Sequence, residues 1–444
     1  MPEPVFTTSA QQPAAAEKIP SDSGLTAAAR ELRSTGCVRL RANALLARAR
    51  RGESAWFEVN DGALPTTASL VADLTRKRFP DLKIPYHSRW RHFEAGGRDR
   101  LQALNHQLMQ ASPQAGPAER ARAHIDLAVV SVLLDAGAGS TWRFNEAPDE
   151  TNASPSAREP QQFSRSEGLG VACFHAFMSG LFSSDKASPL QADAKGLQRI
   201  TADQLAAAFQ VTGTNPLVGL EGRAALLRRL GHALADQPEL FGHQQRPGHL
   251  FDRLGQGKQS VLAHDILSFL LTGMGSIWPA QNTLEGIALG DCWRHPAARS
   301  DPAGSISDGW MPFHKLSQWL TYSLLEPFQW AGVEVEGLES LTGLPEYRNG
   351  GLFLDAGVLV LRDARQREQL HSAGDEIIVE WRALTVALLD ELAPLVREQL
   401  NMTQAQMPLA CILEGGTWAA GRLLAQQLRQ GLPPLNIQSD GTVF

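Results

Sequence analysis

Residues 379–400 read VEWRALTVALLDELAPLVREQL, and this stretch decides the fold class. Its apolar residues recur at steps of three and four, which places them on one face of an α-helix and does not match the alternation of a strand. Segments rich in alanine and leucine show the same spacing along the chain, at 118–135, 165–182, 202–210, 221–235, 260–272, 314–326 and 416–430. The sequence therefore predicts a mainly α-helical protein.

Strand signals are few by comparison. The best are WFEV at residues 56–59 and GVLVL at 357–361, which are rich in β-branched or aromatic residues. Short polar residues such as Ser166 and Thr201 stand at expected helix starts, where their side chains can cap free amide groups. We therefore expect a bundle of helices with at most a small β element.

The chain has 444 residues, which is long enough for a large hydrophobic core. Residues 1–22 are rich in proline, alanine, serine and glutamine without periodicity, so we expect a disordered tail. Residues 23–444 are predicted to form a single mainly helical catalytic domain, and a division into two lobes stays open. Polar stretches with proline at 145–162 and 296–309 predict surface loops.

The composition excludes several classes of partner. Lys and Arg number 41 against 47 Asp and Glu, and the formal net charge of -6 offers no basic surface for nucleic acid. No apolar run reaches the length of about 18 residues that a membrane span needs, and the amino terminus lacks a signal-peptide pattern. We expect a cytoplasmic protein that binds neither nucleic acid nor membrane. The sequence gives no indication of an oligomeric state.

Metal and cofactor motifs are missing from the sequence. The 4 cysteines are far apart, and the 12 histidines form no metal-binding spacing. The glycine-rich stretches lack the patterns of dinucleotide-binding and phosphate-binding loops. No cofactor and no metal ligand are therefore predicted, although a divalent metal ion held by distant residues stays an open alternative.

The segment PYHSRWRHF at residues 85–93 alternates cations with aromatic rings. The planar guanidinium groups of Arg89 and Arg91 suit bidentate contact with phosphate or carboxylate, and neighbouring rings can exclude water. His92 is a further candidate for contact with substrate. An equally supported interpretation is that the two arginines pair with acidic residues at a packing junction.

The segment DLAVVSVLLD at residues 126–135 ends in an acid before a glycine-rich turn and Trp142. Such a carboxylate at the edge of a cleft can have its pKa raised by burial, which suits Asp135 to acid–base catalysis. The alternative is that Asp135 is hydrogen-bonded in a C-terminal turn. Glu167 follows in RSEGLG at 165–170, where small residues permit close approach of a ligand; an acid there also complements the helix dipole.

The segment FHKLSQWLTY at residues 313–322 combines polar and aromatic side chains. Its members at steps of four, His314, Gln318 and Tyr322, share one helical face, with Trp319 and Lys315 beside it. A mixed stripe of this kind is less typical of a core than a leucine stripe, so we favour a pocket lined by these residues over burial in the core.

Later segments add further candidates. LTGLPEYRNGG at 341–351 leads to an acid, EWR at 380–382 opens an apolar helix, and EGGTW at 414–418 precedes an alanine-rich run. The last of these predicts either a helix N-terminus that binds an anion or a simple cap by Thr417. The candidates from these segments are Tyr347, Arg348, Asp355, Glu380, Arg382 and Trp418.

The chain from about residue 26 to its end resembles the uracil catabolism protein 4 family of fungi and bacteria. The resemblance rests on PYHSRWRHF (85–93), SVLLDAGAG (131–139), FHKLSQWL (313–320), LPEYRNGG (344–351) and EGGTW (414–418). It implies a role in a pyrimidine route where uracil is made into its ribonucleotide, a relative of GTP cyclohydrolase II opens the ring, and ribosylurea is an intermediate. The step left to assign is cleavage of the ribose–urea bond.

A fainter similarity points to the queuosine 5'-phosphate N-glycosidase family, which implies a helical fold related to DNA glycosylases. It rests on the order of 165–180, 313–318 and EWRALT at 380–385. That family carries Asp-Tyr-Arg-x-Pro-Gln with a catalytic aspartate, whereas this chain has FHKLSQ at 313–318. Any catalytic carboxylate must therefore come from another segment.

These resemblances predict a hydrolase that cleaves the N-glycosidic bond of ribosylurea, expected to be 5'-phosphorylated. The alternatives are a metal-dependent hydrolase of a ureido intermediate and a non-catalytic binding subunit of the same pathway. The reaction needs a carboxylate near C1', a proton donor for urea and cations for phosphate. The sequence offers Asp135, Glu167, Asp355 or Glu380 as the carboxylate, His314 or His92 as the donor, and Arg89, Arg91, Lys315 and Arg348 as the cations. Rings for stacking are Trp319, Tyr322, Tyr347 and Trp418.

Overall fold

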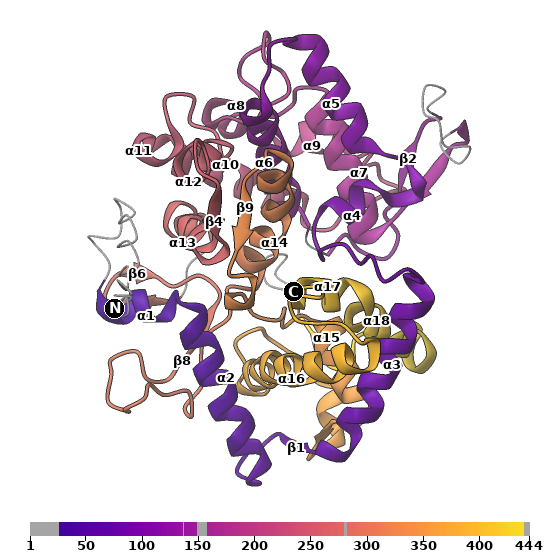
Figure 1. The fold of residues 1–444 in the computed structure, drawn as a ribbon, viewed down its shortest axis with the longest axis vertical. Helices are drawn as coiled ribbons and strands as arrows, with labels where there is room; N and C mark the ends of the chain where they lie inside the picture. Colours follow the sequence, from indigo (N-terminus) through magenta and orange to yellow (C-terminus); the bar gives the residue numbers. More distant parts are fainter. Residues whose placement is uncertain (1–25, 136, 149–157, 279–281, 439–444) are drawn as a thin grey trace, which may run out of the picture.

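The structure is a computed structural model that describes residues 26–135, 137–148, 158–278 and 282–438. Helices dominate this part of the chain, and strands occur only as short pairs, so the prediction of a mainly α protein is confirmed (Figure 1). The predicted tail, residues 1–22, lies outside the described residues. No helix among the described residues has the length and apolar character needed to cross a membrane.

The helices follow one another along the whole described chain. The first half holds α1 (Ala27–Leu32), α2 (Thr35–Arg50), α3 (Leu64–Arg78), α4 (Trp90–Phe93), α5 (Arg100–Ala111), α6 (Pro117–Leu133), α7 (Arg165–Met178), α8 (Ala194–Gln198) and α9 (Ala202–Ala208). The second half holds α10 (Leu220–Ala235), α11 (Pro238–Phe241), α12 (His249–Leu254), α13 (Ala263–Gly273), α14 (Lys315–Trp330), α15 (Tyr347–Asp355), α16 (Glu376–Leu400), α17 (Leu409–Ile412) and α18 (Trp418–Arg429).

The strands form two-stranded pairs between the helices. They are β1 (Phe57–Val59) with β10 (Leu359–Leu361), β2 (Phe144–Glu146) with β3 (Gln161–Phe163), β4 (Ser260–Leu262) with β9 (Glu334–Glu336), β5 (Thr283–Leu284) with β6 (Ile287–Ala288), β7 (Cys292–Arg294) with β8 (Trp310–Pro312), and β11 (Leu370–His371) with β12 (Asn436–Ile437). The two best sequence-predicted strands are β1 and β10, which pair antiparallel with each other.

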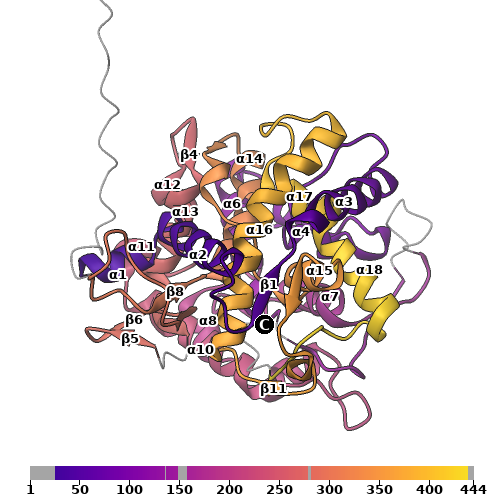
Figure 2. The ribbon, with the colours of Figure 1, turned by 90° about the horizontal axis from the view of Figure 1, so that it is seen from below.

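Helix α16 is the core element, as its sequence predicts. It is 25 residues long, and the apolar side chains of its central turns, such as Leu384 and Leu388, are fully buried. It packs against α2 and α3 from the start of the chain and against α15. Helix α14 packs against α6 and α13. The two ends of the described chain therefore share one core, with the indigo and yellow segments side by side in both views (Figures 1 and 2).

Some expected boundaries differ from the structure. The segment expected to be helical from residue 260 begins with β4, because Ser260–Leu262 pair in parallel with β9. The expected loop 145–162 is wrong at its ends, where β2 and β3 form an antiparallel ladder, while its residues 149–157 lie outside the described part. The expected cap at Thr201 is confirmed, since its hydroxyl accepts from the Gln204 amide at 3.2 Å.

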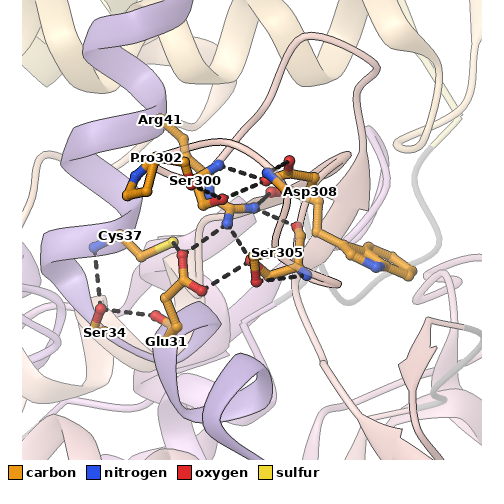
Figure 3. A network of polar contacts seen from close by, with 11 residues as sticks. Glu31, Ser34, Cys37, Arg41, Ser300, Pro302, Ser305 and Asp308 are labelled. Atoms are coloured by element: carbon orange, nitrogen blue, oxygen red, sulfur yellow. Dashed lines mark hydrogen bonds and ion pairs between the residues drawn. The ribbon is translucent and has the colours of Figure 1, made fainter.

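The loop 296–309 contains no helix or strand, as predicted, and a buried arginine anchors it to α2 (Figure 3). Arg41 is fully buried and donates to the Ser307 carbonyl and to the Ser307 hydroxyl, each at 2.7 Å, and to the Glu31 carboxylate at 2.9 Å. Within the loop, Asp308 accepts from the Ser300 amide at 2.6 Å. These bonds satisfy the charge and fix the loop beside β8.

Candidate functional site

Polar side chains from separate segments meet around the N-terminal turn of α14. We call them the central cluster: Arg89, His92, Asp135, Ser166, Lys315, Trp319 and Glu346. They come from the start of α4, the end of α6, the first turn of α7, the first two turns of α14 and the start of α15. Most belong to the sequence segments singled out above, which the fold brings together from positions more than two hundred residues apart.

Asp135 is the most firmly held carboxylate of the central cluster. Its Oδ2 lies 3.1 Å from Nη1 of the fully buried Arg89 and accepts from the Ser166 hydroxyl at 2.5 Å. Burial alone would raise the pKa of Asp135, but the charge of Arg89 and the other nearby donors hold it below its ordinary value. The expected rise is therefore wrong in sign, and Asp135 is ionised at neutral pH.

Contrary to the sequence prediction, Ser166 does not cap α7. The N-cap residue of α7 is Ser164, while the Ser166 hydroxyl contacts Asp135 and also lies 3.1 Å from Nε2 of His92. Burial, together with the charge of Arg89, lowers the pKa of His92 to about 3. His92 is therefore a neutral imidazole at neutral pH, which makes it a hydrogen-bonding partner rather than a proton donor.

Lys315 and Glu346 form the second half of the central cluster. The Lys315 ammonium lies 6.0 Å from the centre of the Trp319 ring, and no carboxylate of the described residues pairs with it within 4.0 Å. Burial lowers the pKa of Lys315, although the negative charges of Glu346 and Asp135 act to raise it. Burial raises the pKa of Glu346, although the charge of Lys315 and two amide hydrogen bonds act to lower it. Both groups are thus poised closer to neutral pH than usual.

The two carboxylates of the central cluster differ in environment. The pKa of Asp135 is lowered and that of Glu346 is raised, which is the arrangement that separates a base from an acid in enzymes. Glu346 lies within LPEYRNGG, and the sequence pattern does not single it out. It caps α15 by accepting from the amides of Arg348 at 2.6 Å and Asn349 at 2.7 Å, and a capping acid has no distinguishing sequence signal.

Several buried polar atoms at this place have no hydrogen-bond partner among the described residues. Within the central cluster they are Arg89 Nη2, His92 Nδ1 and Trp319 Nε1, and in the adjoining first turn of α15 they are Arg348 Nε, Arg348 Nη1 and Asn349 Oδ1. A buried donor or acceptor without a partner costs about 1–3 kcal/mol. These atoms are available for hydrogen bonds to a polar ligand.

Trp418, from EGGTW, has its ring contacts outside the central cluster. Its ring lies 6.2 Å from that of His87, which pairs with Glu414 at 2.8 Å, and Arg422 lies over it at 5.5 Å. Glu167 is half exposed and lies 3.6 Å from Arg422, so it is a surface acid.

The EGGT turn is not the helix N-terminus that the sequence predicts. Residues Leu413–Thr417 form a π-helical turn that joins α17 to α18, so their amides lie inside a helix. The Thr417 hydroxyl makes no capping bond. Both sequence interpretations of Thr417, anion site and cap, are therefore wrong. The glycines serve close packing, since a Cβ on Gly416 would lie 2.6 Å from Val71.

The expected polar stripe on α14 does not line one pocket. The Gln318 side chain donates to the Thr342 hydroxyl at 2.5 Å, and the Tyr322 hydroxyl donates to the Thr342 carbonyl at 2.9 Å, both fully buried. His314 takes a left-handed backbone conformation before the helix and bonds the Leu32 carbonyl at 2.8 Å. The face that meets the other motifs is the one carrying Lys315 and Trp319.

Glu380 lies in a separate buried network. It contacts Nε2 of the buried His295 at 3.0 Å, and Arg48 approaches it at 3.5 Å. His295, Glu376 and Glu380 are close enough to hold a metal ion, because their ligand atoms lie within 4.8 Å of one another. However, Nδ1 of His295 accepts from the Ala297 amide at 3.2 Å, so Nε2 carries the proton and offers no lone pair. The donor set fits a structural ion pair better than a metal.

Other predicted residues also have structural partners. Asp355 is buried against Arg429 at 2.5 Å, and Arg91 pairs with Glu326 at 2.7 Å, in line with the packing-junction interpretation. Trp142 is fully buried and donates to the Phe209 carbonyl at 2.9 Å. Arg382 binds both oxygens of Asp291, each at 2.8 Å. Tyr347 is half-buried, with the Arg348 guanidinium 4.8 Å from its ring.

A family model described as "Protein of unknown function (DUF1688)" matches residues 31–444, which include every segment of the central cluster. The chain belongs to this family. Two curated proteins support the DUF1688 assignment. Protein urg3 of Schizosaccharomyces pombe is 39% identical over 414 residues, which cover 92% of this chain and 96% of that protein. Uracil catabolism protein 4 of Lachancea kluyveri is 39% identical over 388 residues, which cover 81% of this chain and 85% of that protein.

The DUF1688 match confirms the resemblance found in the sequence strings, since a relative that carries the uracil catabolism name aligns with most of the chain. The further similarity to DNA-glycosylase-like folds stays a prediction.

Proposed function

We propose that the protein acts in uracil degradation as a hydrolase that cleaves the N-glycosidic bond of ribosylurea or its 5'-phosphate. The products are urea and ribose or ribose 5-phosphate. The observation that carries this proposal is the pair of carboxylates in the central cluster, Asp135 ionised and Glu346 with a raised pKa. The name of the Lachancea kluyveri relative supports the pathway.

In the proposed reaction, the oxygen of a water molecule forms a bond to C1' as the bond from C1' to the urea nitrogen breaks. Positive charge builds up on the sugar, and the Asp135 carboxylate stabilises it while accepting a proton from the water. The urea nitrogen receives a proton from Glu346, the carboxyl group whose pKa is raised by burial. Solvent then returns the proton from Asp135 to Glu346, so the protein is unchanged.

Cations beside the carboxylates supply the expected phosphate contact. Lys315 makes no ion pair with the described carboxylates, and Arg348 is buried with Nε and Nη1 unpartnered. An ammonium and a guanidinium of this kind can bind a phosphate by charge-assisted hydrogen bonds. Arg89 is already engaged by Asp135 and by Ser131 at 2.7 Å, so it positions the base instead.

The test is incubation of purified, metal-stripped protein with ribosylurea and with its 5'-phosphate. Urea and the free sugar are followed by mass spectrometry. We expect release of urea with ribose 5-phosphate, abolished in Asp135→Asn and retained in Asp203→Asn, whose parent residue is exposed on α9. No turnover of either compound, with and without added divalent metal, would exclude the glycosidase and favour a binding subunit. Turnover only with metal, giving ammonia, would favour the ureido hydrolase.

A further inference from the structure

A cavity of about 640 Å³ lies on the other side of the α14 N-terminus from the central cluster. We call it the second cavity. His314 and Ser317 line it, whereas Lys315 and Trp319 of the central cluster do not. Its other described lining residues lie in 271–278, 282–294 and 372–375, together with Arg33, Leu316 and Gln438. Small-molecule sites usually measure about 300–1,000 Å³, so the space suits one ligand of nucleotide size.

Two tryptophans form walls of the second cavity. Trp293 is fixed by a hydrogen bond from Nε1 to Asp291 at 2.7 Å and by Gly374, where a Cβ would lie 2.9 Å from the ring. Trp278 is half-buried beside Gly290. Indole faces of this kind favour a planar ring, because stacking combines apolar burial with quadrupole attraction.

The charge available to a ligand in the second cavity is positive. Of its two acids, Asp291 is paired with both nitrogens of Arg382 at 2.8 Å. Asp375 accepts from the Ser372 hydroxyl at 2.6 Å and keeps its negative charge, but two arginines, Arg33 and Arg294, also line the cavity. The Arg294 guanidinium stacks on the Trp310 ring at 3.7 Å and makes no hydrogen bond or ion pair with the described residues. Stacking fixes its plane and leaves its N–H groups for an anion.

His314 adds a directional contact to the second cavity. Its Nε2 donates to the Leu32 carbonyl at 2.8 Å, which fixes the tautomer with the proton on Nε2. Its Nδ1 is then an acceptor with no hydrogen-bond partner among the described residues. His314 as a whole is only 4% exposed. An acceptor beside aromatic walls can recognise an N–H group on a planar ring.

We propose that the second cavity is a binding site for a nucleoside monophosphate, with the base between the tryptophans and His314 and the phosphate at Arg294. This site is separate from the central cluster and does not depend on the proposed hydrolase activity. Its base would donate an N–H to His314 Nδ1, a requirement that uracil and guanine rings meet.

The experiment titrates the full-length protein with uridine 5'-monophosphate and follows binding by isothermal calorimetry. The variants are Arg294→Ala and, as a matched control, Arg253→Ala, since Arg253 is exposed on α12 away from the lining residues. Arg348→Ala reports binding at the central cluster. Uridine and inorganic phosphate serve as partial ligands.

We expect saturable binding of uridine 5'-monophosphate that weakens at least tenfold in Arg294→Ala and is unchanged in Arg253→Ala and Arg348→Ala. Each partial ligand should bind at least tenfold more weakly than the whole nucleotide. Absence of binding, or binding that Arg294→Ala leaves unchanged, would overturn the proposal. Binding lost in Arg348→Ala instead would place the nucleotide at the central cluster and also overturn it.

Discussion

Replacing Arg89 by methionine should move the pH dependence of the reaction. The two charges of the Arg89–Asp135 pair are 3.1 Å apart, which corresponds to about 5 kcal/mol at an effective dielectric constant of about 20. Lys315 and the Ser166 hydroxyl remain after the substitution and offset part of this loss. An opposite charge at this range shifts a carboxyl pKa by about 1–3 units, so we expect a rise of that size.

The sign of the effect follows from the environment of Asp135. With Arg89 present, the pKa of Asp135 lies below its ordinary value, so the ionised form persists to low pH. Without Arg89, fewer groups oppose the effect of burial, and the pKa of Asp135 rises. Because the proposed base acts only when ionised, the acid limb of kcat/KM for urea release should move to higher pH by about 1–3 units.

Two controls separate this effect from loss of folding. Breaking a buried ion pair costs about 3–5 kcal/mol, so Arg246→Met, which removes the buried arginine that pairs with Asp126 at 2.8 Å outside the central cluster, should be comparably destabilising. Its acid limb should stay in place. Arg89→Lys keeps the charge and should shift the limb by less than Arg89→Met. A folded Arg89→Met with an unmoved acid limb would refute the assignment of Asp135.

Further predictions concern other parts of the structure. Lys315→Met should raise KM for 5'-phosphorylated ribosylurea at least tenfold and leave KM for ribosylurea unchanged in steady-state assays; equal effects on both substrates would exclude phosphate binding by Lys315. Gly421→Ala places a Cβ 2.0 Å from the Arg348 carbonyl and should destabilise the fold by about 1–3 kcal/mol in guanidinium titrations, whereas an unchanged midpoint would show that α18 can move. Although burial opposes it, the charge of Arg382 lowers the pKa of Asp291 to about 2 from 3.8, so this pair should stabilise the fold above pH 4 and lose about 2 kcal/mol as pH falls to 2. Asp291→Asn should flatten that part of the stability profile, and a profile identical to wild type would contradict the assignment.

The elements that local pattern determines could be predicted from the sequence. The spacing of 379–400 gives the long buried helix α16, and the strands at 56–59 and 357–361 exist as β1 and β10. The strand at 260–262 was missed because its pairing depends on Glu334–Glu336, far away in the chain. Periodicity in the sequence does not show which distant segment a strand pairs with.

In the candidate site, too, local pattern predicts the motifs, whereas contacts between distant segments determine their roles. The motifs that carry Arg89, Asp135 and Lys315 do converge, but the pKa shift of Asp135 was expected in the wrong direction because its sign depends on Arg89. Spacing identified a polar stripe on α14 but not which face meets the other motifs. Glu346 was missed because its role depends on burial and on the charge of Lys315, which are properties of the folded chain.

The most direct test of the account is hydrolysis of 5'-phosphoribosylurea in water labelled with oxygen-18, followed by rapid borohydride reduction and mass spectrometry of both products. Attack at C1' predicts label in the sugar and unlabelled urea, and Asp135→Asn should abolish both products. Label in carbon dioxide, with release of ammonia in place of urea, would show attack on the ureido carbon and contradict the proposed role of the central cluster.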